Sequence, residues 1–132
     1  MHTTAVKLYF LALQIEENAK QRSRIWVNIG AAWQEIDFRR EAFSAYTKAL
    51  TYNNTDPQIW YNLGTLSFYL SRECFSLGNF LAAFDWCKKT VIFWSIMKKL
   101  APGRYYRAEQ WVDDYNSAQK QNKLMNTRLT KT

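Results

Sequence analysis

The sequence predicts an all-α protein of stacked antiparallel helix pairs, and two observations lead to this prediction. A Trp-x-Asn-x-Gly pattern begins at Trp26 and begins again 34 residues later at Trp60. Glycine (4) and proline (2) are scarce in the 132 residues, which argues against strands and tight turns. A fixed period of this length in a helix-favouring chain is typical of helix pairs that bury their apolar faces by stacking on neighbouring pairs.

The period and the residue choice are those of a tetratricopeptide repeat (TPR), and the first full copy spans residues 23–56. Its first helix places apolar residues at i, i+3, i+4 and i+7, which is one helical face: Trp26, Ile29, Gly30 and Trp33. Its second helix has the small, large, small spacing of Ala42, Tyr46 and Ala49. We expect Gly30 to let the second helix approach closely.

The second copy, residues 57–100, has lengthened helices. Its turn-like segment Leu77–Phe80 comes seven residues later than the period predicts. Seven residues are about two helical turns, so the added length keeps the same face inward. We therefore predict one long helix from Pro57 to Ser76. The next helix carries Ala83, Cys87 and Thr90, aligned with the second helix of the first copy, and ends near Lys99 because Pro102 follows.

The two ends of the chain complete a solenoid in this prediction. Residues 3–20 form the second helix of an incomplete repeat, because Ala5, Tyr9 and Ala12 reproduce its spacing. The outer side of that helix is apolar, so either a partner covers it or the chain is a fragment. Residues 103–121 form a capping helix that closes a single TPR domain over 1–121. Residues 122–132 form a basic flexible tail.

Composition limits the function classes. The net charge is +7, but the basic residues are spread along the chain, and nucleic-acid binding is not expected. The bases near the C-terminus, which either are solvated or contact an acidic partner or lipid headgroups, are Lys120, Lys123, Arg128 and Lys131. The apolar run 91–97 is too short to span a bilayer, and no secretory signal is expected.

No residue pattern points to catalysis or to a cofactor. Asp113 and Asp114 are adjacent, so on a helix they point about 100° apart and cannot act as an acid and base pair. Cys74 and Cys87 are thirteen residues apart, and the only histidine is at position 2. This predicts neither a metal site nor a disulfide framework, although a single bridge stays open. We expect a protein that is not an enzyme and binds no cofactor.

Repeat geometry predicts which side chains face a partner-binding groove. These positions are Val27, Asn28, Ala31, Gln34, Glu35, Gln58, Tyr61, Asn62, Thr65, Phe68 and Tyr69. Asn28 and Asn62 occupy equivalent places, where an amide either binds the backbone of an extended peptide or satisfies a neighbouring turn. The inner positions hold no basic cluster, which argues against capture of a C-terminal carboxylate.

A second candidate surface is apolar. On the first helix it consists of Leu8, Phe10 and Leu11. Near the end of the second copy it consists of Phe93, Trp94 and Met97. Aromatic residues of this kind either form an interface hot spot or pack the core between the last helices.

The segment from Pro57 to Trp111 resembles a known family. Its closing pattern, L-x-P-G-x-Y-x-x-A-x-x-W over residues 100–111, is similar to that of the chloroplast and cyanobacterial TPR proteins required for photosystem I assembly. That family has the same lengthened helix before the glycine equivalent to Gly78. The resemblance extends upstream in register to about Ala5, in a shortened and divergent form.

The resemblance implies a function. It implies a non-catalytic scaffold or chaperone for photosystem I assembly, located in the plastid, peripherally on the stromal side of the thylakoid membrane. The implied partners are the large reaction-centre subunits or a stromal-side subunit of photosystem I. A resident peripheral subunit of the mature complex is one alternative, and a generic peptide-binding TPR adaptor is another.

Overall fold

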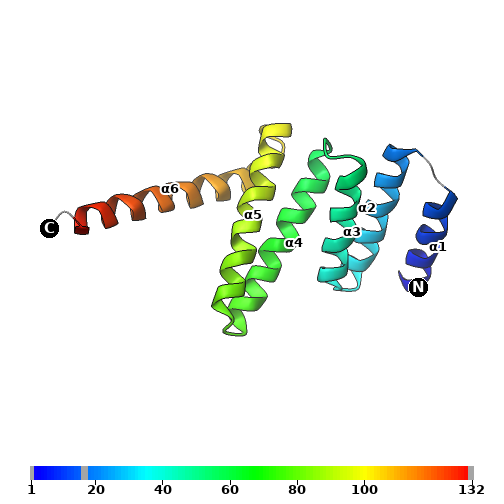
Figure 1. Cartoon of the computed structure of the whole chain (residues 1–132), viewed down its shortest axis with the longest axis horizontal. Coiled ribbons are helices and arrows are strands. Elements are labelled where there is room, and N and C mark those ends of the chain that lie inside the picture. The colour runs from blue at the N-terminus through cyan, green and yellow to red at the C-terminus, as the bar shows by residue number, and fades with distance from the viewer. Residues whose placement is uncertain (1, 16–17, 131–132) are drawn as a thin grey trace.

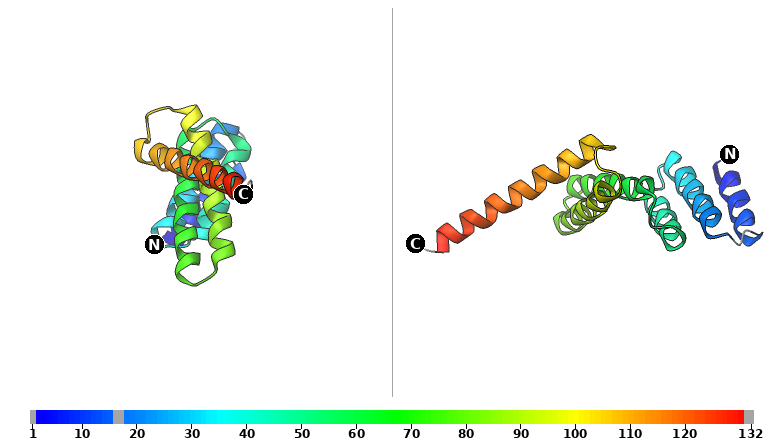
Figure 2. Two further views of the ribbon diagram at one scale, coloured as in Figure 1. Left: turned by 90° about the vertical axis from the view of Figure 1, so that its left-hand side faces the viewer. Right: turned by 90° about the horizontal axis from the view of Figure 1, so that it is seen from above.

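The computed structural model describes residues 2–15 and 18–130, and every element in them is a helix. The helices are α1 (His2–Ile15), α2 (Ala19–Glu35), α3 (Arg39–Tyr52), α4 (Pro57–Ser76), α5 (Phe80–Leu100) and α6 (Tyr106–Thr130). Helices α1 to α5 stand side by side in a row, and α6 projects away from the end of that row (Figure 1). The view from above shows the same succession (Figure 2). The predicted all-α stack of helix pairs is confirmed.

Both hairpin turns are built in the same way, although one is seven residues later in its repeat. Asp37 ends α2 with a φ of 63° and Gly78 ends α4 with a φ of 80°. In each turn the backbone amide of the next residue donates to a carbonyl in the last turn of the helix. The Phe38 amide donates to the Trp33 carbonyl at 2.9 Å, and the Asn79 amide donates to the Cys74 carbonyl at 2.9 Å. This pattern of reverse bonds is the Schellman ending of a helix.

Each hairpin is locked by an aromatic side chain that lies across a glycine. A Cβ added at Gly30 would lie 2.7 Å from the Tyr46 ring, and one added at Gly64 would lie 2.2 Å from the Trp94 indole. The polar tip of each ring then donates to the glycine's own helix. The Tyr46 hydroxyl donates to Gln34 Oε1 at 3.0 Å. The Trp94 Nε1–H donates to the carbonyl of Tyr61 at 3.2 Å.

This contact corrects the predicted alignment of the second copy. We aligned Cys87 with Tyr46, but the side chain that crosses Gly64 is Trp94, seven residues further along α5. The helices α4 and α5 are antiparallel, and each is seven residues longer between the contact and the turn. The residue that crosses the glycine is therefore seven positions later in α5 than the alignment with α3 predicts. The face is unchanged, since seven residues are about two turns, and Thr90 and Met97 beside Trp94 are fully buried.

The ends of the chain differ from the predicted boundaries. The first helix ends at Ile15, and Ala19 already belongs to α2, so a helix over 3–20 is wrong. The Asn18 side chain accepts the Gln21 amide and caps the start of α2, which explains the earlier boundary. The last helix runs to Thr130, so the segment expected to be a flexible tail is helical where the structure describes it. Lys131 lies outside the described residues.

The turn before α6 is held by one buried carboxylate. Gly103 has a φ of 81°, and its amide donates to both oxygens of Glu109 at 3.1 and 3.0 Å. A carboxylate in the first turn of a helix also interacts favourably with the helix dipole. Ala108 and Val112 then pack against Trp94 and Met97, and this cluster joins α6 to α5.

Candidate functional site

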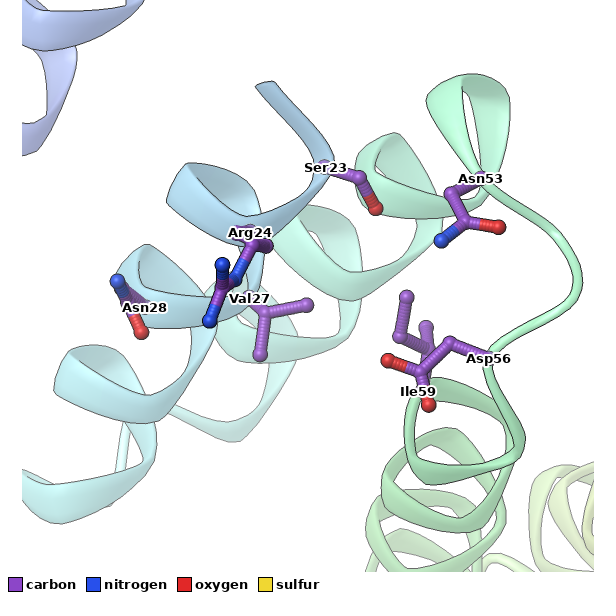
Figure 3. Close-up of a pocket in the computed structure, with 7 residues that line it drawn as sticks. All are labelled: Ser23, Arg24, Val27, Asn28, Asn53, Asp56 and Ile59. Carbon is purple, nitrogen blue, oxygen red and sulfur yellow. The ribbon is translucent and has the colours of Figure 1, made fainter. Parts of the chain in front are cut away.

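An open pocket of about 210 Å³ lies between the start of α2 and the connection from α3 to α4. Its lining comes from three neighbouring elements: Ser23, Arg24, Val27, Asn28, Asn53, Asp56 and Ile59. Val27 from α2 and Ile59 from α4 point into the space between their helices (Figure 3). The pocket therefore has an apolar floor and polar side chains around it.

Three of the polar lining groups already make hydrogen bonds within the chain. The Asn53 Oδ1 accepts from the backbone amide and the hydroxyl of Thr55 at 3.1 and 2.8 Å. The Ser23 hydroxyl donates to the carbonyl of Ala49 at 2.9 Å and joins α2 to α3. Asp56 accepts the Gln58 amide at 2.9 Å and caps α4, whose first residue is Pro57. These bonds fix the positions of both walls without occupying the opening.

The side chains of Arg24 and Asn28, which also line the pocket, are available to a ligand. Within residues 2–15 and 18–130, neither the Arg24 guanidinium nor the Asn28 side-chain amide makes a hydrogen bond or an ion pair. Arg24 and Asn28 are four residues apart, so they lie on the same face of α2. A guanidinium and an amide next to an apolar floor can bind the carbonyls of an extended peptide and one of its apolar side chains.

The groove positions predicted in the first hairpin divide into two groups. Val27 and Asn28 line the pocket, and Ala31 is half-buried one turn further along α2. Gln34 is used inside the hairpin, where it accepts the Tyr46 hydroxyl. Glu35 is exposed at the end of α2. The part of the predicted groove that the pocket includes is therefore the middle of α2.

The equivalent positions in the second hairpin are covered by the chain itself. Tyr105, just before α6, stacks on Tyr61 with ring centres 4.2 Å apart, and its hydroxyl donates to Gln58 Oε1 at 2.6 Å. Gln58 in turn donates to Asn62 Oδ1 at 2.8 Å. Asn62 Oδ1 is therefore used by a side chain of its own helix and not by a neighbouring turn.

Three further groove predictions on α4 also make contacts within the chain. Thr65 donates to the carbonyl of Tyr61 at 3.0 Å. Phe68 meets the Trp111 ring edge-on at 5.8 Å, so α6 packs over it. Tyr69 is the most exposed of the three, and the Arg39 guanidinium lies 5.4 Å from its ring centre.

The apolar surface predicted on α5 is not open. Met97 is fully buried and Trp94 is 7% exposed, so their assignment to an exposed interface face is wrong. The reason is that Trp94 fills the space beside Gly64 and Met97 packs under α6. Phe93 is half-buried and contacts the rings of Phe43 and Trp60.

The apolar surface predicted on α1 is open. Leu8, Phe10 and Leu11 are 61%, 42% and 58% exposed, although Phe10 also meets Trp26 edge-on. The basic residues Lys120, Lys123 and Arg128 all lie on the exposed outer part of α6. None of these residues lines the pocket.

Burial raises the pKa of two tyrosine hydroxyls, one on α3 and one just before α6. It raises the pKa of Tyr46 to about 12 and raises that of Tyr105 above its ordinary value. Both hydroxyls therefore stay protonated at neutral pH and can donate the bonds to Gln34 and Gln58. Cys74 and Cys87 are both free thiols.

Sequence reasoning missed most of the pocket. Ser23, Arg24, Asn53, Asp56 and Ile59 were not predicted as groove residues, yet they line it together with Val27 and Asn28. A signal was present for Arg24, because it precedes Asn28 by four residues on the same helical face. Asn53 and Asp56 come from the α3–α4 connection, whose path the repeat pattern does not specify.

The described helices include no cluster of metal-ligating side chains, and none of them is long and apolar enough to cross a membrane. The stacked antiparallel pairs, the repeated glycine contacts and the open pocket define the class of the protein as a TPR-like helical stack. No model of a known protein family matches the chain.

The chain is a distant homologue of the photosystem I assembly protein Ycf3. It is 25% identical to that protein from Cuscuta gronovii over 111 residues, 24% identical to the one from Cuscuta obtusiflora and 26% identical to the one from Sorghum bicolor. Each match covers 84% of this chain, and the chain spans about two thirds of the relatives' length, 66%, 66% and 64%. The resemblance stated from the sequence is confirmed.

Proposed function

We propose that this protein is a non-catalytic scaffold that holds a segment of a photosystem I subunit during assembly, on the stromal side of the thylakoid membrane of a plastid. The observation that carries the proposal is the similarity to Ycf3 over 84% of the chain. The pocket on α2 supplies the place for the segment, since its free guanidinium and amide suit the carbonyls of an extended chain. The proposed partner is one of the large reaction-centre subunits or a stromal-side subunit.

The test is affinity purification of the tagged protein from solubilised thylakoid membranes in which photosystem I is being assembled. We expect subunits of incomplete photosystem I to co-purify with the wild-type chain. A variant with Arg24→Gln and Asn28→Ala should lose them, because both free polar groups of the pocket are removed. A matched variant with Lys120→Gln and Lys123→Gln, which changes polar residues outside the pocket, should retain them. Recovery of no photosystem subunit would contradict the proposal.

A resident subunit of the mature complex is the second candidate. It is favoured by the large apolar side chains that stay exposed on α1 and at the α4–α5 turn, since permanent interfaces bury such surface. The same purification separates the two candidates. A resident subunit is recovered at one copy per mature complex, whereas an assembly factor is recovered only with intermediates.

A generic peptide-binding adaptor is the third candidate, and the pocket alone would support it. It follows if the tagged chain captures other proteins through Arg24 and Asn28 and no subunit of photosystem I. This outcome would retain the assignment of the pocket and remove its connection with photosynthesis.

A further inference from the structure

The end of the α4–α5 hairpin carries a group of exposed large apolar side chains. Five large apolar side chains cluster there, each at least half exposed: Phe75, Leu77, Phe80, Leu81 and Phe84. Leu77 and Leu81 are 77% and 84% exposed, the highest values among the large apolar residues that the structure describes. We call these five residues the hairpin tip. Their exposure is not explained by packing within the chain or by the pocket.

The hairpin tip exists because both helices are lengthened. Figure 1 shows the α4–α5 turn projecting beyond the neighbouring α2–α3 turn. The contact between Gly64 and Trp94 already holds the hairpin together near its middle, so the outer turns are not needed for that contact. The additional length carries apolar side chains out to the end of the molecule opposite the pocket, about 30 Å along α4.

The positions of the charged residues define the length of the uncharged segment at the hairpin tip. Residues 74–84 contain no charged side chain, and charges begin again at Glu73 and Asp85. These two positions are each six residues from Asn79 at the apex, which is about 9 Å at the helical rise per residue. Apolar faces of peripheral proteins enter the boundary between headgroups and acyl chains by about 5–10 Å. The uncharged part of the tip matches that depth.

The charges behind the tip suit a headgroup layer. The residues next to the tip include three bases and two acids: Arg72, Lys88 and Lys89, and Glu73 and Asp85. The charge of Glu73 is already paired with Arg39 at 3.5 Å. The Lys88 ammonium lies 4.6 Å from the centre of the Phe84 ring, so its stem runs along an apolar side chain while its charge stays at the edge of the tip. Lysines placed in this way keep their charge in the polar layer while apolar neighbours are buried.

The shape of the tip distinguishes between two kinds of binding partner, a protein helix and a lipid bilayer. The tip is a convex end of two helices, and a partner helix would require a groove to lie in. A bilayer needs no complementary shape, because its interface closes around any apolar projection. We propose that the hairpin tip inserts into the interfacial layer of a lipid bilayer and orients the pocket away from the membrane. This proposal stands without the proposed function, since it depends only on the tip's chemistry.

The test is flotation of the full chain with vesicles of phosphatidylcholine, with and without phosphatidylglycerol. We expect the wild-type chain to float with both. Phosphatidylglycerol should increase binding through the basic side chains, and salt should remove only that increase. The double variant Leu77→Ser, Leu81→Ser should bind about tenfold or more weakly, since it removes two large apolar side chains from the interface.

The matched control is Leu8→Ser, Leu11→Ser, which removes two exposed leucines from α1. It should bind vesicles as the wild type does. Circular dichroism should show both variants folded, because the four side chains are exposed. The proposal is overturned if the wild type does not float, if the tip variant floats equally well, or if both variants lose binding equally. Self-association that depends on Leu77 and Leu81, without vesicle binding, would assign the tip to a second copy and would also overturn it.

Discussion

In the α2–α3 hairpin the locking contact lies eight residues from the apex of the turn, and in the α4–α5 hairpin it lies fifteen residues away. Gly30 and Tyr46 flank Phe38 at equal spacing, and Gly64 and Trp94 flank Asn79 in the same way. Both helices of the second hairpin have therefore gained two turns beyond an unchanged contact. The comparison teaches that a helix pair can be lengthened without disturbing its core when the added residues complete whole turns.

The two hairpins also differ in what they present to a partner. The first offers an open polar pocket beside α2. In the second, Tyr105 and Trp111 cover the equivalent face of α4. The second hairpin instead exposes an apolar tip at its far end. One repeat pattern thus carries two surfaces of opposite polarity, at opposite ends of the helices.

The largest expected effect is on the lock of the second hairpin. Gly64→Ala places a Cβ 2.2 Å from the Trp94 indole, which is held between α4 and α6 and cannot move aside. We expect the free energy of unfolding to fall by about 3 kcal/mol, even after the helix-forming advantage of alanine. Urea unfolding followed by circular dichroism measures it. In a Trp94→Leu background the same change should cost much less, and an equal cost would show that the contact is not the cause.

High pH should weaken the first hairpin through Tyr46. Burial raises the pKa of its hydroxyl to about 12, against about 10 in the unfolded chain. Between these values the unfolded chain has released a proton that the folded chain retains, so stability falls as pH rises from 10 to 12. We expect this residue to account for a loss of about 2 kcal/mol over that range. The variant Tyr46→Phe should lose this part of the pH dependence, and an unchanged slope would contradict the assignment.

A smaller effect is expected at the lock of the first hairpin. Gly30→Ala brings a Cβ to 2.7 Å from the Tyr46 ring, whose hydroxyl bonds the half-buried Gln34 and can shift with it. We expect a loss of about 1 kcal/mol in the free energy of unfolding. Measured under the same conditions as Gly64→Ala, it should be clearly the smaller of the two. A loss equal to that of Gly64→Ala would mean that the two locks are equally rigid.

The smallest effect concerns the turns. Asp37 has the positive φ that Gly78 provides in the second hairpin. Asp37→Gly should therefore raise the free energy of unfolding by about 0.5–1 kcal/mol, since glycine adopts this conformation without strain. The ion pair lost with Arg39 is long, at 3.9 Å, and Asp37 is exposed, so its removal matters little. The reciprocal change Gly78→Ala should lower stability, and the same sign for both changes would contradict this account.

The sequence predicted the helices where periodicity and capping agree. The helix Pro57–Ser76 was predicted with both of its ends, because Pro57 marks one and the Gly78 turn marks the other. Gly30 was predicted to lie at a helix contact because it stands on the apolar face of its helix, and Gly64 occupies the same place in the repeated pattern. The alignment of Cys87 with Tyr46 did not identify Trp94 as the partner of Gly64, because spacing within a helix shows a face but does not show the register between two helices.

The site was less predictable than the fold. Asn28 and Val27 were found because they sit on the repeat pattern, whereas Asn53 and Asp56 belong to a connection with no periodicity. The covering of Tyr61 by Tyr105 depends on the direction taken by the chain after Pro102, which three-dimensional packing decides. The hairpin tip was visible in the sequence only as a turn, since exposure at the end of a hairpin leaves no period to detect.

The most direct test of the central claim uses the two equivalent asparagines as sites for a photo-crosslinking residue. Asn28 lies at the open pocket, and Asn62 lies in the network closed by Gln58 and Tyr105. On irradiation with thylakoid membranes that contain photosystem I intermediates, the chain modified at position 28 should cross-link to a photosystem I subunit, and the chain modified at position 62 should not. Cross-links from position 62 alone, or from neither position, would contradict the account.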